Sequence, residues 1–309
     1  MEKTKEKLLL VDGHNLLFQM FYGMPARIVN HEGRAIQGTL GFVGALLKII
    51  RRIEPSHMAV IFDGEHENRR KGLSEDYKAN RPDYSKVPGE ENPFSQLPDV
   101  YRALDYLGIP YWETEECEAD DEIAAYVYTY GKLSRHCISD ADLSGQADTA
   151  YAMWKNRLEI VISSFDSDFF QLITENVSVL RYRGEKTVLC DVAYIREKLG
   201  IEPSQYAEYK ALTGDKADNI EGIRGVGPKT AADLMRQFGS LEKLLAHRGE
   251  IRKPSLQNVL MEEEERLCRN YQLIWLDGRA PIPRKLEELA WKDCGMTTTE
   301  VLKGIGLKQ

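Results

Sequence analysis

The chain has 309 residues, of which 42% are hydrophobic and 29% are charged, so it can form a folded core of about two domains. Its five cysteines are odd in number and none lies in a CxxC pair, which argues against a disulfide framework and a structural zinc site. The net charge of −8 discourages a nucleic-acid partner until the positions of the acidic residues are considered.

Three apolar runs each end in an aspartate. These are residues 8–11 before Asp12, residues 58–62 before Asp63, and residues 160–165 before Asp166. Continuous apolar runs of this length are typical of strands that are buried on both faces, as in a parallel sheet. Because a helical pattern over residues 39–52 separates the first two runs, the order predicts a parallel α/β unit.

The three aspartates are expected at one edge of this sheet, because ligands of such sheets bind beyond the carboxyl ends of the strands. A single aspartate in this position is more often a helix N-cap or a turn residue. Three strands that end in the same way favour a shared site.

Residues 66–98 differ from the rest of the chain, with almost no apolar periodicity and four prolines. This pattern predicts a long, mobile surface segment that forms no core. Basic residues slightly outnumber acidic ones, and Tyr77 and Tyr84 are suited to stacking on unpaired bases. A solvated charged loop is the alternative interpretation.

Further helices are predicted beyond the first two strands, and the part from Pro203 onward is expected to be mostly helical. A helix is predicted to begin near Glu118, whereas residues 131–157 are polar and could hold one or two short helices. From Pro203 onward helical patterns prevail, with two such segments on either side of residues 222–230. Residues 256–275 are predicted as one helix whose acidic run at 262–265 forms a solvated face.

Nine carboxylates lie near the predicted strand ends or in short acidic motifs. They are Asp12, Asp63, Glu118, Asp120, Asp121, Asp166, Asp168, Asp215 and Asp218. Asp215 and Asp218 are three residues apart, so one helical turn would place both on the same face. Without these nine, 40 acidic residues remain against 41 basic ones, and the objection to a nucleic-acid partner weakens. Glu65 and Glu122 are interpreted as ordinary surface charges.

Such a cluster needs cations or protons, since like charges about 4 Å apart repel by roughly 1–4 kcal/mol per pair. Oxygen ligands without histidine or cysteine select hard ions such as Mg²⁺ or Mn²⁺. Two such ions suit the hydrolysis of a phosphodiester. Individually, Asp121 and Asp215 could instead cap a helix or pair with a basic side chain.

Residues 222–230 contain three glycines, Gly222, Gly225 and Gly227, followed by Lys229 and Thr230. The segment follows no strand and lacks Walker spacing, so neither a dinucleotide fold nor a P-loop is indicated. A turn between two helices could bind a nucleic-acid backbone through its N–H groups and Lys229. A plain helix–helix turn is the alternative.

Seven motifs in order resemble those of the bacterial 5′ nuclease family, which comprises the 5′→3′ exonuclease domain of DNA polymerase I, its free-standing relatives and their flap endonuclease kin. They are residues 9–13 (LLVDG), 60–63 (VIFD), 77–82 (YKANRP), 118–121 (EADD), 166–168 (DSD), 214–220 (GDKADNI) and 225–231 (GVGPKTA). The resemblance implies an α/β, PIN-like (resolvase-like) fold with a mostly parallel central sheet flanked by helices, a helix–three-turn–helix DNA-binding subdomain and a helical arch.

The resemblance also implies the roles of individual residues. A first metal site would use Asp12, Asp63, Glu118, Asp120 and Asp121. A second would use Asp166, Asp168, Asp215 and Asp218. DNA contacts would come from Arg70, Tyr77, Lys78, Arg81, Gly222, Gly225, Gly227, Lys229 and Thr230. Two Mg²⁺ or Mn²⁺ ions are expected, with K⁺ at the helix–three-turn–helix element.

The resemblance further predicts how the chain is divided. A catalytic domain would span residues 6–183, with an arch at about 66–98 and an insertion at about 131–157, followed by a helical domain over 184–290 and a tail over 291–309. The insertion makes the connection from Asp121 to Asp166 longer than is usual in the family. Gln19 stands where family members often have arginine, and a free-standing form without a polymerase region is expected.

We therefore expect a structure-specific 5′ nuclease of DNA replication and repair that acts on DNA with single-stranded 5′ ends, flaps or nicks, and on RNA primer ends. The alternative is a module that binds flaps or junctions with little or no cleavage. An aspartyl phosphatase fits poorly, because Gly13 and His14 follow Asp12 where a second acid is needed. A bacterial, cytoplasmic monomer is expected, since no apolar run approaches the roughly 18 residues of a membrane span.

Overall fold

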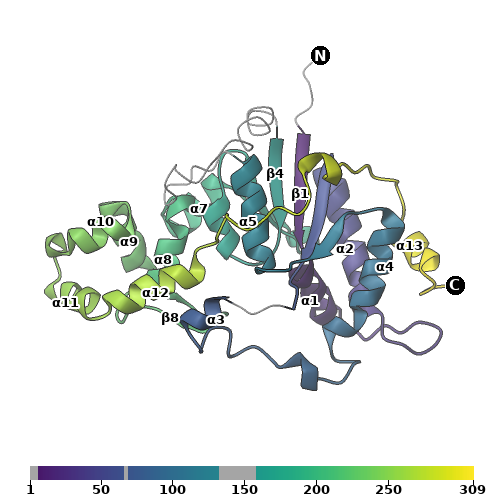
Figure 1. Ribbon diagram of the computed structural model, residues 1–309, viewed down its shortest axis with the longest axis horizontal. Coiled ribbons are helices and arrows are strands. Elements are labelled where there is room, and N and C mark those ends of the chain that lie inside the picture. The colour runs from purple at the N-terminus through teal and green to yellow at the C-terminus, as the bar shows by residue number, and fades with distance from the viewer. Residues whose placement is uncertain (1–5, 66–68, 132–157) are drawn as a thin grey trace, which may run out of the picture.

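The computed structural model describes residues 6–65, 69–131 and 158–309, and its centre is a six-stranded sheet (Figure 1). The strand order is β3-β2-β1-β4-β5-β6, and only β6 runs antiparallel to its neighbour. The strands are β1 (Glu6–Asp12), β2 (His57–Phe62), β3 (Tyr111–Glu113), β4 (Leu158–Ser163), β5 (Val177–Arg181) and β6 (Val188–Cys190). The mostly parallel sheet predicted from the three apolar runs is confirmed.

Helices cover both faces of the sheet, which is why its central strands are apolar on both sides. Along β1, Leu8 and Leu10 face one hydrophobic core, while Leu9 and Val11 face the other. The N-terminal helices are α1 (Gly13–Gly23), α2 (Gln37–Ile53), α3 (Arg69–Leu73), α4 (Leu97–Leu107) and α5 (Ala119–Tyr130). Helices α1, α2 and α4 pack on the second core, and α5 packs on the first.

The C-terminal part is helical, as predicted, and residues 206–274 extend away from the sheet beyond α5, whereas the last helix lies on the opposite side, beside α4 (Figure 1). Its helices are α7 (Val192–Leu199), α8 (Tyr206–Thr213), α9 (Pro228–Phe238), α10 (Leu241–Ala246), α11 (Pro254–Glu262), α12 (Glu264–Ile274) and α13 (Thr298–Gly304). The helix predicted over 256–275 is in fact two helices, because the chain leaves helical geometry at Glu263.

A two-stranded hairpin, β7 (Gly214–Asp215) and β8 (Ile220–Glu221), stands where one helical turn was predicted. The turn passes through Asn219, which has a φ of 58°, a left-handed conformation that asparagine tolerates better than most residues. The prediction that Asp215 and Asp218 lie close together is therefore met through a hairpin turn and not through a helix.

The 66–98 segment is not a helical arch among the residues that the structure describes. It holds the five-residue helix α3, a run of turns and two short 3-10 helices before α4 begins at Leu97. Lys78 has a φ of 57°, so the backbone is not helical between the basic residues Lys78 and Arg81. Tyr77 is only 2% exposed and belongs to the first hydrophobic core, so the prediction that this segment contributes nothing to a core was wrong.

The last helix packs on the helical layer that covers one face of the sheet. Helix α13 packs against α2 and α4, and Val301 and Leu302 are buried in the second core. The segment predicted as a tail is thus part of the N-terminal body. The prediction for residues 132–157 lies outside the described residues, and among the helices that the structure describes none is long and apolar enough to span a membrane.

Candidate metal centre

The carboxyl ends of the central strands bring the first three predicted carboxylates together. Asp12 ends β1, where it caps α1 by accepting the Asn15 N–H at 3.0 Å. Asp63 follows β2 and accepts the Ala119 N–H at 2.8 Å, which ties it to the start of α5. Glu118 is the residue before α5, so its side chain points from the same edge.

The remaining carboxylates complete two groups. Carboxylate oxygens of Glu118, Asp120 and Asp121 lie within 4.8 Å of one another, and the same holds for Asp168, Asp215 and Asp218. A cavity of about 430 Å³ is lined by Glu118 and Asp120 of the first group together with Asp12, Asp63 and Asp166, and Asp166 in turn lies beside Asp168 of the second group. All nine predicted carboxylates therefore gather at one edge of the sheet, and each of the two groups offers only oxygen donors, which suits hard divalent ions.

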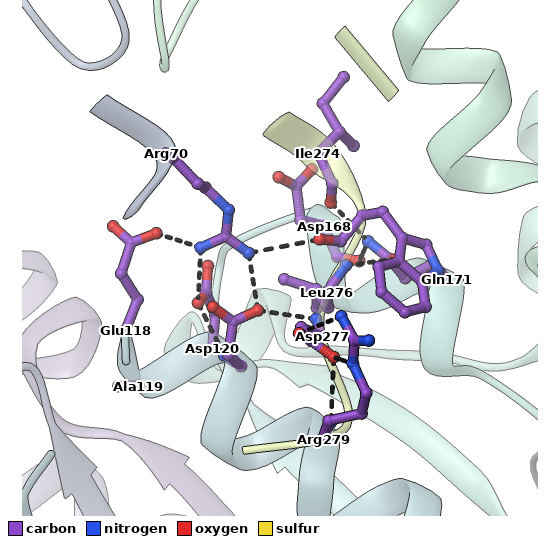
Figure 2. A network of polar contacts seen from close by, with 12 residues as sticks. Arg70, Glu118, Ala119, Asp120, Asp168, Gln171, Ile274, Leu276, Asp277 and Arg279 are labelled. Carbon is purple, nitrogen blue, oxygen red and sulfur yellow. Dashed lines mark hydrogen bonds and ion pairs between the residues drawn. The ribbon is translucent and has the colours of Figure 1, made fainter. Parts of the chain in front are cut away.

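Basic side chains from the 66–98 segment lie directly on the first group (Figure 2). The Arg70 guanidinium pairs with Glu118, with Asp120 at 3.4 Å and with Asp121 at 2.7 Å. Lys78 also pairs with Glu118. Arg70 and Lys78 thus provide part of the positive charge that keeps these carboxylates ionised.

The second group has its own cations. Lys210, on α8, is 8% exposed and pairs with Asp168 at 2.8 Å and with Asp215. Arg81 pairs with Asp218 at 2.7 Å from a more exposed position. Four basic side chains thus face nine carboxylates, which leaves the cluster with an excess of acidic groups.

The pKa values of these acids diverge according to their partners. Burial, with repulsion from Asp63, raises the pKa of Asp12 to about 7, and burial beside Asp166 raises the pKa of Asp168 to about 7. Burial also raises the pKa of Asp120 well above its usual range. Burial opposes the ionisation of Asp63, but hydrogen bonds from His14 and Ala119 outweigh it and hold the pKa of Asp63 at about 2. The cluster is held partly protonated without additional cations.

Residues 76–81 dock on the turn that carries Asp218. The Lys78 N–H donates to the Asp218 carbonyl at 3.0 Å. Side-chain amides close the contact on both sides, from Asn80 to the Lys216 carbonyl at 3.0 Å and from Asn219 to the Asp76 carbonyl at 2.9 Å. These bonds place the basic residues over both carboxylate groups.

Two predicted positions differ from expectation, and a third, Gln19, has a structural partner. The buried ring of Tyr77 offers no open face for stacking on a base, and its hydroxyl donates to Glu118 at 3.4 Å. Glu122 is not a surface charge, because it is 4% exposed and accepts a hydrogen bond from Trp112. Burial raises the pKa of Glu122 to about 7. Gln19 donates to the Tyr182 carbonyl at 2.5 Å, so it joins α1 to the end of β5.

The glycines of the turn before α9 have two different structural environments. A Cβ on Gly222 would lie 2.4 Å from the backbone of Thr213, so this glycine is required by close packing. Gly225, with a φ of 76°, and Gly227 both face open space at the start of α9. Lys229 is exposed and Thr230 is partly exposed beside them, so this end of α9 is accessible to a phosphate backbone.

Two residues at the centre were not found by sequence reasoning. His14 lies beside Asp63, with its Nδ1 3.4 Å from an Asp63 carboxylate oxygen, and its ring packs edge-on against Phe62 and Phe94. Lys210 precedes Asp215 by five residues in a helix with no other functional signal. The position of His14 directly after Asp12-Gly13 could have indicated it, whereas nothing in the local sequence marks Lys210.

Comparison with known sequences matches the chain to one family in two regions. One family model, described as "5'-3' exonuclease, N-terminal resolvase-like domain", matches residues 7–145, and another, "5'-3' exonuclease, C-terminal SAM fold", matches residues 201–297. The thermostable DNA polymerase I of Thermus thermophilus is 32% identical over 280 residues, which cover 91% of this chain and 30% of the relative. DNA polymerase I of Bacillus subtilis is 31% identical over 293 residues, which cover 93% of this chain and 30% of the relative. The chain thus spans about a third of the length of these curated relatives.

Solved structures share the fold. The T5 5′-exonuclease with bound divalent metal ions (zinc) has a TM-score of 0.67 at 22% identity, covering 88% of this chain and 90% of its own. The bacteriophage T5 D15 flap endonuclease in a complex with DNA and metal ions has a TM-score of 0.66 at 20% identity, covering 97% and 99%. The catalytic core of Rad2 with DNA substrate has a TM-score of 0.55 at 15% identity, covering 97% and 88%. With both of its domains matched in order, the chain belongs to the 5′-3′ exonuclease family.

Proposed function

We propose that the protein is a structure-specific 5′ nuclease, a 5′→3′ exonuclease and 5′-flap endonuclease that hydrolyses DNA phosphodiesters in replication and repair. The observation that carries this proposal is the gathering of two all-carboxylate groups at one edge of the sheet, with a cavity at the first group that also reaches Asp166, Lys78 and Arg81. An acidic pocket bordered by basic side chains can hold cations and the phosphate between them.

Two divalent ions, Mg²⁺ or Mn²⁺, fit this donor set. Asp12, Asp63, Glu118, Asp120 and Asp121 would hold the first, and Asp166, Asp168, Asp215 and Asp218 the second. When bound, such ions activate a water and stabilise the charge that develops on the phosphate and the leaving oxygen. The excess of carboxylates over basic partners and the raised pKa values of Asp12 and Asp168 support cation binding at both groups.

The basic residues have a second role in this proposal. Lys78 and Arg81 form ion pairs with Glu118 and Asp218, which are themselves proposed ligands. Once their acids are neutralised, these side chains can turn to the phosphate of the 5′ strand that enters the cavity. The open N-terminus of α9, with Gly225, Gly227 and Lys229, would bind the duplex backbone without reading the bases.

The test is cleavage of a labelled 5′-flap duplex with Mg²⁺ and with EDTA. We expect cleavage only with Mg²⁺ or Mn²⁺, and Asp63→Asn should lower the rate by about 100-fold or more, because it removes one proposed ligand. Flap binding in Ca²⁺ should persist in this variant. Binding without cleavage by the wild-type protein in Mg²⁺ and Mn²⁺ would instead identify a flap- or junction-binding module.

The remaining assignments are proposals of the same kind. DNA with single-stranded 5′ ends, flaps or nicks is the proposed partner, with RNA primer ends as a further substrate and K⁺ at the 222–230 turn as a further ion. We also propose a bacterial protein that acts as a cytoplasmic monomer. The proposal of a DNA partner is supported by the T5 and Rad2 neighbours, which were solved with DNA.

A further inference from the structure

A buried glutamine joins the second carboxylate group to the end of α12. Gln171 lies in the 3-10 turn Asp168–Leu172 and is 6% exposed. Its Nε2 donates to the carbonyl oxygens of Asp168 at 2.9 Å and of Ile274 at 3.0 Å. Its Oε1 accepts the Leu276 N–H at 3.0 Å. Each donor and acceptor of this side chain is thus matched to a backbone group, which leaves the amide a single orientation.

The same stretch of chain also contacts the first carboxylate group. We call residues 274–277 the clasp segment, which is seen between Gln171 and Asp120 in Figure 2. The Asp277 N–H donates to the Asp121 carboxylate at 2.8 Å. The Trp275 carbonyl accepts from Arg70 at 3.4 Å, and Arg70 in turn holds Asp121. Four successive residues therefore contact Gln171 and the Asp121 side of the centre through backbone atoms alone.

The clasp segment is fixed in position by its own side chains. Ile274 and Leu276 are each 1% exposed and belong to the first hydrophobic core. A segment anchored in this way cannot shift toward one carboxylate group without breaking its bonds to the other. Its backbone therefore bridges the Gln171–Asp168 side of the centre and the Asp121 side.

We propose that Gln171 is a positioning residue that sets the spacing of the two metal-binding groups through the clasp segment. This inference rests on the proposed function, since it concerns how two ions are held at a fixed separation. Gln171 contacts neither the cavity nor a proposed ligand carboxylate, so it acts through the backbone of Asp168 and of the clasp segment. Groups that orient metal ligands in this way affect metal affinity or activity by about 10- to 100-fold.

The chain offers a matched control in Gln205. Its Nε2 donates to the carbonyl oxygens of Met235 at 3.0 Å and Gly239 at 2.8 Å, and its Oε1 accepts the Glu202 N–H at 3.0 Å. It therefore makes the same three kinds of bond, but at the end of α9 and not at the carboxylates. Gln171→Met and Gln205→Met each lose all three bonds with little change of volume.

The experiment titrates Mn²⁺ into each protein and follows the free ion by electron paramagnetic resonance. The wild-type protein and Gln205→Met should bind two ions alike. Gln171→Met should keep the first ion and bind the second about tenfold or more weakly. Its kcat for flap cleavage should fall, whereas KM and flap affinity in EDTA should not change, because the DNA contacts lie elsewhere.

Equal Mn²⁺ affinities and kcat in Gln171→Met and Gln205→Met would overturn the inference and leave the proposed function intact. A wild-type protein that neither binds two Mn²⁺ ions nor cleaves flaps would overturn the proposed function itself. If Gln171→Met does not fold, Gln171→Asn replaces it, because it keeps a neutral amide at this site but is one methylene too short to make all three bonds. The same weakening of the second ion is expected.

Discussion

Removal of the Arg70 guanidinium should destabilise the metal-free protein severely. The Arg70 side chain is 9% exposed and pairs with Glu118 and Asp121, which are each 13% exposed. Loss of one partner from a buried ion pair costs about 3–5 kcal/mol, because the remaining charges are left buried and unpaired. Against a typical unfolding free energy of about 5–15 kcal/mol, Arg70→Met should therefore be marginally folded in EDTA.

Divalent ions should restore much of this loss. A ligand present at 100 times its Kd stabilises the folded state by about 2.7 kcal/mol. In the wild-type protein part of this gain is offset, because an ion at Glu118 and Asp121 competes with Arg70. In Arg70→Met the guanidinium no longer competes with Mg²⁺ for Glu118 and Asp121. Mg²⁺ should therefore raise the unfolding free energy of Arg70→Met by more than it raises that of the wild type.

Urea unfolding followed by circular dichroism, in EDTA and in Mg²⁺, measures both quantities. Arg196→Met is the control, because Arg196 pairs with Glu202 on the exposed surface and its loss should change neither value. The reasoning is refuted if Arg70→Met is as stable as the wild type in EDTA, or if Mg²⁺ stabilises the two proteins equally.

Further predictions concern pH, the glycine turn and the 5′ strand. The pKa of Asp12 is about 7 in the folded protein, above its unfolded value of about 3.9, so the folded state holds this proton more tightly. The free energy of unfolding in EDTA should therefore fall as pH rises from about 5 to 8, and it should fall less steeply in Asp12→Asn. Thermal unfolding at several pH values measures this difference. Gly222→Ala should lower the melting temperature because its Cβ would overlap the Thr213 backbone, whereas Gly227→Ala should leave it unchanged. Arg81→Glu should slow flap cleavage more than it weakens duplex binding, compared at fixed salt, because it places a negative charge where the 5′ strand is proposed to enter.

The sheet and its acidic edge could be predicted because their signals are local. An apolar run that ends in aspartate identifies a buried parallel strand and its functional end, and this pattern places Asp12 and Asp63 correctly. The pair Asp215 and Asp218 was also placed together, although by the wrong local structure. A spacing of three residues fits a helical turn and a hairpin turn equally well, and only the left-handed Asn219 distinguishes them.

The partners of the acids could not be predicted, because they depend on contacts between distant parts of the chain. Arg70 lies 48 residues from Glu118, and Arg81 lies 137 residues from Asp218. From its composition, the segment that carries Arg70 and Arg81 is only a polar loop with a small excess of basic charge. Tyr77 was assigned to base stacking for the same reason, since nothing in its sequence neighbours indicates that the core covers it.

The distribution of the centre along the chain has a consequence for how the protein folds. Its carboxylates begin at Asp12 and end at Asp218, and the clasp segment that joins them lies at residues 274–277. Contacts of such long sequence separation form late, because the entropy of closing the intervening chain must be overcome first. During synthesis, the sheet, whose last strand ends at Cys190, can therefore form before Asp215, Asp218 and the clasp segment have emerged from the ribosome. A nascent or truncated chain would hold a folded but incomplete centre, and the proposed hydrolytic activity would begin only when almost the whole chain has emerged.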